Sequence, residues 1–584
     1  GVAFNPPRSF KAVARVKFRE TFFPDDPFRR MKDQTAARKA AIGIRYFVPI
    51  LEWITKYRMS LFKYDLLAGI TIASLAIPQG ISYANLAKLP PVIGLYSSFV
   101  PPLVYAVFGS SNHLAVGTVA ACSVLIAETI GEVAPPDADL DLYVHLVLTS
   151  ALISGLFQLA LGALRLGILV DFMSHSAITG FMGGTAILII LQQFKGLLGL
   201  KHFTQRTDVV SVIRAIFHNR HEWNLICLVI GVVFLIFLQA TRYVRKVKPK
   251  LFWVSAIGPI IAVIVGCLLA YFFDFKKRNI PIVGHLKRGI NGLSIRELNF
   301  GSEYFAAVLK AGLITGMIAL AEGIAIGRSF AIQTNEQIDG NKEMVAFGLM
   351  NIIGSMTSCY LTTGPFSKTA VNFNAGCKTP MANIVQAICI MLVLLFLAPV
   401  FSYTPQVALS AIIISAMLGL IKYKKYRHLF LTDKFDFLIC MCAFVGVPFI
   451  SMDMGLILSV GLSLVRALLY VARPASCKLG KMPDSDHLYR DVEQYPAARG
   501  IPGFLILQMG SPVYFANGTY VKERILRLVR NEEDELENQS AGGEGVKYVV
   551  LDLGGVTAID VTGMESLLEI SRTLQNKGIK VHLF

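Results

Sequence analysis

Apolar segments follow one another from residue 65 to residue 472, and they limit this chain to a membrane protein with many crossings. A spanning helix needs about 20 apolar residues. The chain is 54% hydrophobic and 16% charged, whereas soluble domains carry about 25% charged residues. The pattern predicts a polytopic α-helical fold with fourteen segments, several too short for a complete crossing. These segments are residues 66–84, 94–108, 119–130, 143–163, 172–195, 224–241, 252–272, 305–330, 343–358, 366–376, 381–400, 407–421, 436–450 and 454–471.

Different regions flank the apolar domain of residues 65–472. Residues 1–64 are basic and rich in aromatic side chains, too short for a substantial domain. In residues 473–584 strands alternate with helices, which predicts a small α/β domain, and a final βα portion is expected to follow. Its predicted elements are strand 504–509, helix 517–530, acidic loop 531–545, strand 548–553, helix 563–575 and strand 580–584.

Charge in the loops predicts the orientation in the membrane. Loops 241–250 and 422–434 are strongly basic and therefore cytoplasmic, while loop 132–141 has no Lys or Arg and is external. An even number of segments then places both termini in the cytoplasm. Loops 195–220 and 276–296 are basic but fall outside on this count, so we expect structured caps that attract anions. The net charge of +17 indicates loops facing anionic lipid rather than a nucleic-acid partner.

One stretch deep in the apolar domain, Tyr360–Lys368 with its continuation to Asn372, reads as a break followed by a new helix. Pro365 suits the first turn of that helix because its missing N–H is no loss there. Ser367 and Lys368 place a hydroxyl and a positive charge at the new N-terminus, where free N–H groups and the helix dipole favour anions. A lysine at membrane depth is costly and marks a candidate functional site.

A similar break lies about 250 residues earlier. Residues 110–118 are a polar interruption followed by the short predicted helix 119–130. In segment 66–84, Pro78 and Gly80 are predicted to interrupt the helix, next to the polar side chains of Gln79 and Tyr83. Interrupted segments in corresponding halves indicate inverted repeats with a substrate between them. A structural proline kink is the alternative for segment 66–84.

The sequence shows no pattern typical of a metal site, a nucleotide-binding site or a catalytic site. Six of the nine cysteines sit in or beside apolar segments without the paired spacing of a metal site. No nucleotide-binding loop, metal cluster or catalytic triad is evident. We therefore expect neither an enzyme nor a cofactor.

Several stretches resemble the plant-type sulfate permeases, the sulfate transporter/STAS family. They are Ile77–Pro91, Gly94–Pro102, Gly109–Val119, Ser174–Gly184, Ala321–Phe330, Gly340–Asn351 and Thr362–Asn372, together with the terminal α/β domain. The chain looks closest to plant group 3 members, which share the Gly117-Thr118-Val119 variant and the Phe22–Phe28 turn. The resemblance implies two inverted seven-segment repeats arranged as core and gate domains, and a cytoplasmic STAS domain. It also implies a homodimer through the STAS domain and the N-terminal region, in the plasma membrane or, alternatively, a plastid or other internal membrane.

The resemblance also implies where the anion binds. The site lies between the helix starting near Val116–Thr118, which includes Gly117, and the helix starting at Phe366–Lys368, which includes Ser367. Gln79 and Tyr83 come in from the first segment, and Glu322 matches the proton-linked acid of the family. The sulfate-transporting pattern usually reads Phe-Ser-Arg-Ser, whereas this chain has Lys368 in place of arginine. Lysine keeps the charge but loses the planar fork that binds an oxyanion bidentately.

Charge arithmetic suggests a mechanism. Two helix N-termini contribute roughly half a charge each, so with Lys368 the site carries about +2, matching one divalent anion. Ionised Glu322 would reduce this to about +1, and burial favours its neutral form. Proton and anion would then move together by an elevator or rocking motion of core against gate. The alternatives are a salt bridge of Glu322 with Arg328 or Lys368, a snorkelling Lys368, and Tyr83 as packing only.

A possible regulatory site lies in the α/β domain. Residues 559–563 resemble the bacterial anti-sigma antagonist loop, in which a phosphorylated serine occupies the position of Thr562. A phosphate would be stabilised at a helix N-cap. The alternative is that Thr562 only caps the helix.

The leading prediction is proton-coupled sulfate uptake, with three alternatives. Phosphate, molybdate or selenate are oxyanions of similar size and could replace sulfate. The protein could instead be an uncoupled anion channel or exchanger, against which the intramembrane acid Glu322 argues. It could also be a partner subunit that pairs with another permease and transports little alone, which the lysine at position 368 keeps open.

Overall fold

The computed structural model shows two compact units, residues 1–460 and residues 461–584. It describes residues 9–22, 43–45, 48–166, 174–200, 203, 209–248, 251–275, 278–284, 286, 288–336, 338–419, 421–450, 452–483, 485, 487–539 and 545–584. Beyond Phe22, the predicted turn at 22–28 lies outside the described residues.

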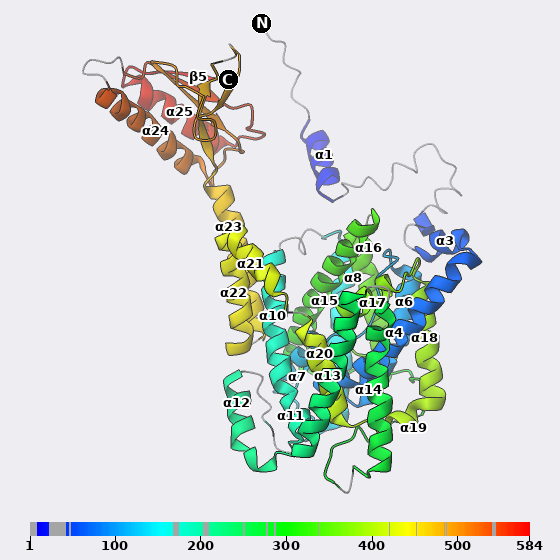
Figure 1. The fold of residues 1–584 in the computed structure, drawn as a ribbon. Helices are drawn as coiled ribbons and strands as arrows, with labels where there is room; N and C mark the ends of the chain where they lie inside the picture. The colour runs from blue at the N-terminus through cyan, green and yellow to red at the C-terminus, as the bar shows by residue number, and fades with distance from the viewer. Residues whose placement is uncertain are drawn as a thin grey trace. The chain divides into compact units, whose positions relative to one another are not determined.

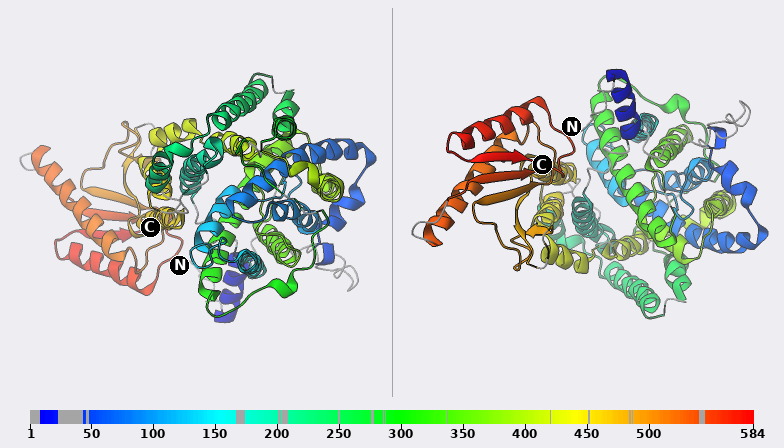
Figure 2. Two further views of the ribbon diagram at one scale, coloured as in Figure 1. Left: turned by 90° about the horizontal axis from the view of Figure 1, so that it is seen from below. Right: turned by 90° about the horizontal axis from the view of Figure 1, so that it is seen from above.

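The first unit is helical. Most of its helices run in roughly one direction (Figure 1), and Figure 2 shows the bundle along that direction. Its elements are α1 (Phe10–Phe22), α3 (Ile50–Trp53), η2 (Ile54–Lys56), α4 (Met59–Leu86), α5 (Pro91–Tyr96), α6 (Val100–Phe108), α7 (Ala120–Thr129), α8 (Leu140–Ala163), α10 (His175–Gln192), α11 (Phe194–Leu198), α12 (Val209–His218), η3 (Arg220–Glu222), α13 (Leu225–Val247), α14 (Phe252–Phe272), η5 (Ile295–Glu297), α15 (Phe305–Thr334), α16 (Gly340–Ser355), α17 (Phe366–Asn374), α18 (Met381–Leu392), η6 (Val393–Leu397), α19 (Ala398–Phe401), α20 (Gln406–Leu418), α21 (Tyr423–Thr432), α22 (Lys434–Phe449) and α23 (Met452–Ala472), the last of which continues into the second unit.

Each of the fourteen predicted segments corresponds to a helix or to consecutive helices of this list. Among the described residues, eight helices are long and apolar enough to cross a membrane by length and composition. The others include α7 and α17, with 10 and 9 residues. Such short helices cannot cross a bilayer alone, so they end within it beside other protein segments.

Several predictions about helix bounds were wrong; most of the predicted basic loop 422–434, for example, is helix α21. Segment 66–84 is not interrupted, because α4 is one 28-residue helix with Pro78 inside it. Gly80 allows the backbone of α5 to approach, since a Cβ there would lie 2.8 Å from the carbonyl oxygen of Gly94. Close packing of α5 at Gly80, and of α18 at Gly69, therefore accompanies an unbroken helix despite the proline. Likewise, residues 241–247 of the predicted basic loop are the last two turns of α13.

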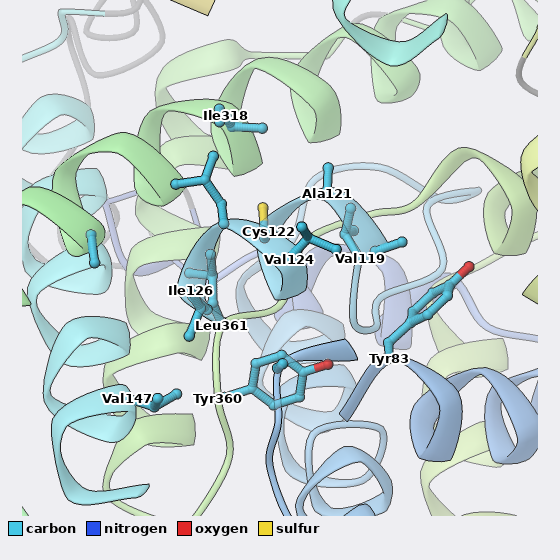
Figure 3. Close-up of a cluster of buried hydrophobic side chains, with 14 of the residues drawn as sticks. Tyr83, Val119, Ala121, Cys122, Val124, Ile126, Val147, Ile318, Tyr360 and Leu361 are labelled. Atoms are coloured by element: carbon cyan, nitrogen blue, oxygen red, sulfur yellow. The ribbon is translucent and has the colours of Figure 1, made fainter. Parts of the chain in front are cut away.

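A buried apolar cluster holds α7 in place (Figure 3). Val119, Cys122 and Ile126 of this segment pack with Tyr360 and Leu361, which precede α17 in an extended stretch. The hydroxyl groups of Ser123 and Tyr360 lie 3.0 Å apart. The two interrupted stretches are thus joined through one core, which fixes the start of α7 relative to the chain that leads into α17.

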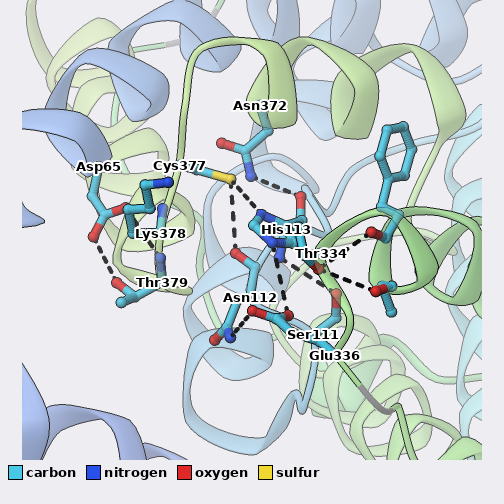
Figure 4. A network of polar contacts seen from close by, with 12 residues as sticks. Asp65, Ser111, Asn112, His113, Thr334, Glu336, Asn372, Cys377, Lys378 and Thr379 are labelled. Atoms are coloured by element: carbon cyan, nitrogen blue, oxygen red, sulfur yellow. Dashed lines mark hydrogen bonds and ion pairs between the residues drawn. The ribbon is translucent and has the colours of Figure 1, made fainter.

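A polar network fixes the other end of α17 (Figure 4). The buried carboxylate of Asp65, on α4, accepts hydrogen bonds from the backbone N–H groups of Lys378 and Thr379 at 2.7 and 3.1 Å and from the Thr379 hydroxyl at 2.6 Å. Nearby, the Asn372 amide donates to the carbonyl oxygen of His113 at 2.9 Å. These bonds satisfy the irregular backbone after α17 inside the protein, as a membrane environment requires.

The second unit contains a five-stranded sheet of β1 (Ser476–Lys481), β2 (Tyr489–Asp491), β3 (Phe504–Met509), β4 (Tyr548–Asp552) and β5 (Lys580–Leu583), with helices α24 (Gly518–Gln539) and α25 (Val561–Gln575). The strand order is β2-β1-β3-β4-β5, with β3, β4 and β5 parallel and β1 antiparallel to both neighbours. Helices α24 and α25 connect the parallel strands, and right-handed connections place both on one face.

The predicted acidic loop 531–545 was wrong in its first part, because α24 continues to Gln539. Helix-forming Glu and Leu residues favour this extension. Glu532 forms an ion pair with Lys478 of β1, and Glu533 Oε2 lies 3.8 Å from Lys577 Nζ. Strands β1 and β2 were not predicted from the sequence.

Candidate anion site

The two interrupted stretches meet directly. Gly117 and Thr363 form an isolated antiparallel bridge, with N–H to carbonyl distances of 2.9 and 3.0 Å in the two directions. Helix α7 begins just after the first strand and α17 just after the second. The first N–H groups of a helix have no partner inside it. The bridge therefore places two helix N-termini, each with a partial positive charge, close to each other.

Asparagine side chains hold both extended strands. Asn383 Oδ1 accepts from Val116 N at 3.1 Å, while its amide donates to the carbonyl oxygen of Leu114 at 2.8 Å. Asn351 does the same for Thr362, accepting from its N–H at 2.9 Å and donating to its carbonyl oxygen at 3.0 Å. These amides substitute for neighbouring strands, so extended backbone is tolerated within a helical membrane domain. Neither asparagine was predicted from the sequence as part of the site.

A cavity of about 30 Å³ lies at the two helix N-termini. Its walls come from six helices and their caps, which are otherwise far apart in the sequence. The lining residues are Tyr83, Val119, Ala120, Ala121, Met182, Thr185, Ile189, Glu322, Pro365, Ser367, Ala416 and Met417. Of the predicted site residues, Tyr83, Ser367 and Glu322 therefore come together here.

Two polar groups in this cavity have no hydrogen-bond partner among the residues that the structure describes. Glu322, on α15, is 6% exposed, and its Oε2 atom is buried without a partner. Thr185, on α10, is 3% exposed, and its hydroxyl is also without a partner. Unsatisfied buried polar atoms cost free energy, so both are positioned to contact a polar species in the cavity. Thr185 was missed because a single threonine in an apolar helix gives no sequence signal.

The predicted ligand Lys368 does not line the cavity. Its side chain is 2% exposed, and Nζ donates to the carbonyl oxygen of Val116 at 2.9 Å. No ion pair joins it to Glu322 within the described part of the chain, and Glu322 Oε2 is unpartnered. The ammonium thus lies behind the strand that carries Gly117, where its charge adds to the potential of both helix N-termini.

The first strand lies beside the cavity rather than in it. Val116, Gly117 and Thr118 are extended, and α7 begins only at Ala120, so the helix start predicted near 116–118 was placed too early. Gly117 leaves room for Lys368, because a Cβ there would lie 2.2 Å from Lys368 Nζ. Phe366 is the first residue of α17. Gln79, 3% exposed, donates to the Ser367 hydroxyl over 3.5 Å.

Replacing Gly117 by alanine is expected to weaken anion binding by about tenfold or more, because the added Cβ would displace the Lys368 ammonium from its carbonyl partner. Equilibrium binding of radiolabelled sulfate, the anion predicted from the sequence, to the purified variant measures this effect. Gly461→Ala, at a position with open space around it, is the matched control. Unchanged binding by Gly117→Ala would show that the position of the ammonium does not matter.

Thr562 is exposed at the second position of α25. The N-cap is Asp560, whose Oδ1 accepts from Gly563 N at 2.7 Å, so the expectation that Thr562 itself caps this helix was wrong. The Asp560 carboxylate also accepts from Phe515 N at 2.9 Å through Oδ2. No group of His, Cys, Asp or Glu with metal-binding arrangement occurs among the described residues.

Two protein-family models and several known proteins match this sequence. The sulfate permease family model matches residues 62–443, and the STAS domain model matches residues 495–584. Probable sulfate transporter 3.5 of Arabidopsis thaliana is 63% identical over 582 residues, which cover 100% of this chain and 90% of that protein. Sulfate transporter 3.1 of the same plant is 53% identical over 577 residues, covering 99% and 87%.

Solved structures show the same fold. The structure of SLC26A9 superimposes with a TM-score of 0.81 at 24% identity, covering 100% of this chain and 91% of that one. The transmembrane domain of the cyanobacterial bicarbonate transporter BicA has a TM-score of 0.58 at 20% identity, covering 70% and 98%.

The matches to the sulfate permease and STAS family models and to named transporters define a multi-pass membrane transport protein rather than an enzyme. The chain belongs to the sulfate permease family. Its relatives include the plant group 3 sulfate transporters, which confirms the resemblance inferred from the sequence.

Proposed function

We propose that this protein is a secondary active transporter that moves sulfate into the cell together with protons. The observation that carries the proposal is the cavity lined by the N-termini of α7 and α17 and by Glu322. Two helix N-termini and a buried lysine favour a divalent anion. The unpartnered Glu322 carboxyl faces the same space, so its charge would oppose that anion. The names of the plant relatives support sulfate as the substrate.

Protonation of Glu322 removes the opposing charge, so a proton and an anion are expected to bind together. The cavity has about 30 Å³, which suffices for about one water but not for a larger oxyanion. Entry of the anion then requires α10 and α20, which close the cavity on one side, to move away from α7 and α17. We assign the first pair to a gate and the second to a core that rocks or shifts against it.

We also propose how the domains are arranged, how the protein assembles and how it is regulated. Residues 1–64 form a cytoplasmic N-terminal region, 65–472 the transport domain and 473–584 the cytoplasmic STAS domain. The N-terminal region and the STAS domain support a homodimer in the plasma membrane, with anionic lipid along the basic loops. Phosphorylation of the exposed Thr562 would add negative charge at the start of α25 and regulate the STAS domain.

Uptake by the purified protein in proteoliposomes tests the proposal. Radiolabelled sulfate and phosphate are offered at about pH 5.5 and about pH 7.5, with empty liposomes as the control. We expect saturable sulfate uptake that is several-fold faster at the lower pH, because protonated Glu322 favours the anion. Preference for phosphate would reassign the substrate among the oxyanions, molybdate and selenate being tested as competitors. Sulfate flux without pH dependence would support a channel or exchanger.

A second candidate function is a partner subunit that transports little alone. The observation that favours it is the Lys368 ammonium, which bonds to Val116 and does not line the cavity. This candidate predicts no uptake of either anion by the purified protein. Uptake would then appear only when a second permease is present in the same liposomes.

A further inference from the structure

A second polar cavity lies beside the central one, between α4, α13, α14, α17 and α20. Its volume is about 110 Å³. Ser367 and Ala416 line both cavities, so the two spaces are neighbours that share a wall. The side chains that distinguish the second cavity are Arg242 and Arg245 of α13.

The two arginines have no acidic partner among the residues that the structure describes. They lie three positions apart on α13 and therefore on the same side of the helix. Gly419, just after α20, leaves room for Arg242, since a Cβ there would lie 2.9 Å from Nη1. Two partly buried guanidinium groups on one helix repel each other. An anion between them would remove that repulsion and supply the missing charge.

Gln79 gives an independent indication of a ligand. Its side chain is 3% exposed and lines this cavity, and its buried Oε1 atom has no hydrogen-bond partner within the described part of the chain. Rotation of the terminal amide by about 180° reaches the other preferred position of this torsion. In that position the Ser367 hydroxyl can donate to Oε1, while the amide N–H groups face the cavity. The site then offers donors from an amide and two guanidinium groups.

The position of the cavity along α20 indicates its role. Residues 416 and 417 of α20 line the central cavity, and residues 412, 415, 416 and 419 line the arginine cavity. Near the other end of α20, residues 406, 409, 410 and 413 line a third cavity of about 300 Å³ that includes Lys88 and Lys195. Along α20 the order is therefore the cavity with the two lysines, the central cavity and the cavity with the two arginines.

We propose that the arginine cavity is a second oxyanion-binding site, in which Arg242, Arg245 and Gln79 hold the anion next to the central site. This inference rests on the proposed transport of an oxyanion. The planar guanidinium matches the edge of a tetrahedral oxyanion through two parallel hydrogen bonds, which a spherical halide cannot accept. The site therefore supplies the bidentate recognition that Lys368 cannot give.

Equilibrium binding of radiolabelled sulfate to the purified full chain in neutral detergent tests the second site. We expect two binding components in the wild type. The double variant Arg242→Gln/Arg245→Gln should lose one component, with its affinity lowered about tenfold or more. Lys368→Ala should lose the other component and retain the arginine site. Lys246→Gln, an exposed residue of the same helix, is the matched control and should leave the binding curve unchanged.

Several outcomes would overturn the second site. One is a wild-type curve with a single component that Lys368→Ala abolishes, and another is a double variant that binds as the wild type does. If the double variant does not fold, Arg242→Lys and Arg245→Lys keep the charge. They should lower sulfate affinity several-fold without changing chloride affinity, and an unchanged preference for sulfate overturns the proposal.

The detergent experiment also separates a soluble oxyanion from a lipid headgroup, which shares its phosphate chemistry. Added anionic phospholipid should leave sulfate binding at the arginine cavity unchanged, whereas soluble glycerol phosphate should compete. Displacement by the lipid alone would overturn the proposal in favour of a headgroup site. A wild type that binds two sulfates but carries none across a membrane would refute the proposed transport while the second site stands.

Discussion

Lys368→Ala is expected to reduce sulfate uptake by about 100-fold or more. The ammonium is buried behind the bridge of Gly117 and Thr363, where it adds to the positive potential of two helix N-termini. At about 6 Å and an effective dielectric constant of about 20, a unit charge contributes about 3 kcal/mol to the binding of each anionic charge. Initial rates of radiolabelled sulfate uptake at saturating and limiting concentrations measure the effect.

Two further variants test whether the effect of Lys368→Ala comes from the buried positive charge at this position. Lys424→Ala removes an exposed lysine from the same unit and should transport at the wild-type rate. Lys368→Arg keeps the charge and should retain transport within about tenfold of the wild type. If Lys368→Ala transports within about threefold of the wild type, the buried charge is not part of the anion site.

The Glu322→Gln variant is expected to lose the pH dependence of uptake. Glutamine has the shape of the protonated acid and carries no charge, so it should permit sulfate binding at both about pH 5.5 and about pH 7.5. In the wild type, a fall in pH protonates Glu322 and removes its opposing charge, so uptake rises. The variant cannot release a proton, and therefore should not accumulate sulfate against its gradient. Uptake driven by an imposed pH gradient measures both effects.

Glu303→Gln serves as the control, because Glu303 is exposed before the start of α15 and does not line the cavity. It should leave the pH profile unchanged. A Glu322→Gln variant whose uptake still rises several-fold at low pH, and still follows the imposed gradient, would exclude Glu322 as the coupling acid.

Local patterns were enough to predict most of the helices. Each predicted apolar segment corresponds to helical structure. A membrane helix needs a continuous run of apolar side chains, and such a run is visible directly in the sequence. The breaks before α7 and α17 were also predictable. Gly117, Thr362 and Pro365 interrupt the helical pattern locally, so each break is visible in the residues that form it.

Predictions failed where packing outweighed local preference. Pro78 lies within α4 because neighbouring helices hold its backbone helical, as the close approach of Gly80 to Gly94 shows. The extension of α24 to Gln539 is a different case, because its Glu and Leu residues favour a helix locally, and ion pairs with lysines of β1 and of the chain before β5 add to that preference. Neither partner is near in sequence.

The class of fold and the two stretches where an anion site could form were predictable, because both depend on residues adjacent along the chain. Which groups share one cavity depends instead on tertiary packing. It joined Gly117 to Thr363, brought Thr185 beside Glu322, and turned Lys368 toward Val116. Contacts between residues tens to hundreds of positions apart depend on how helices pack, and that information is not contained in any local pattern.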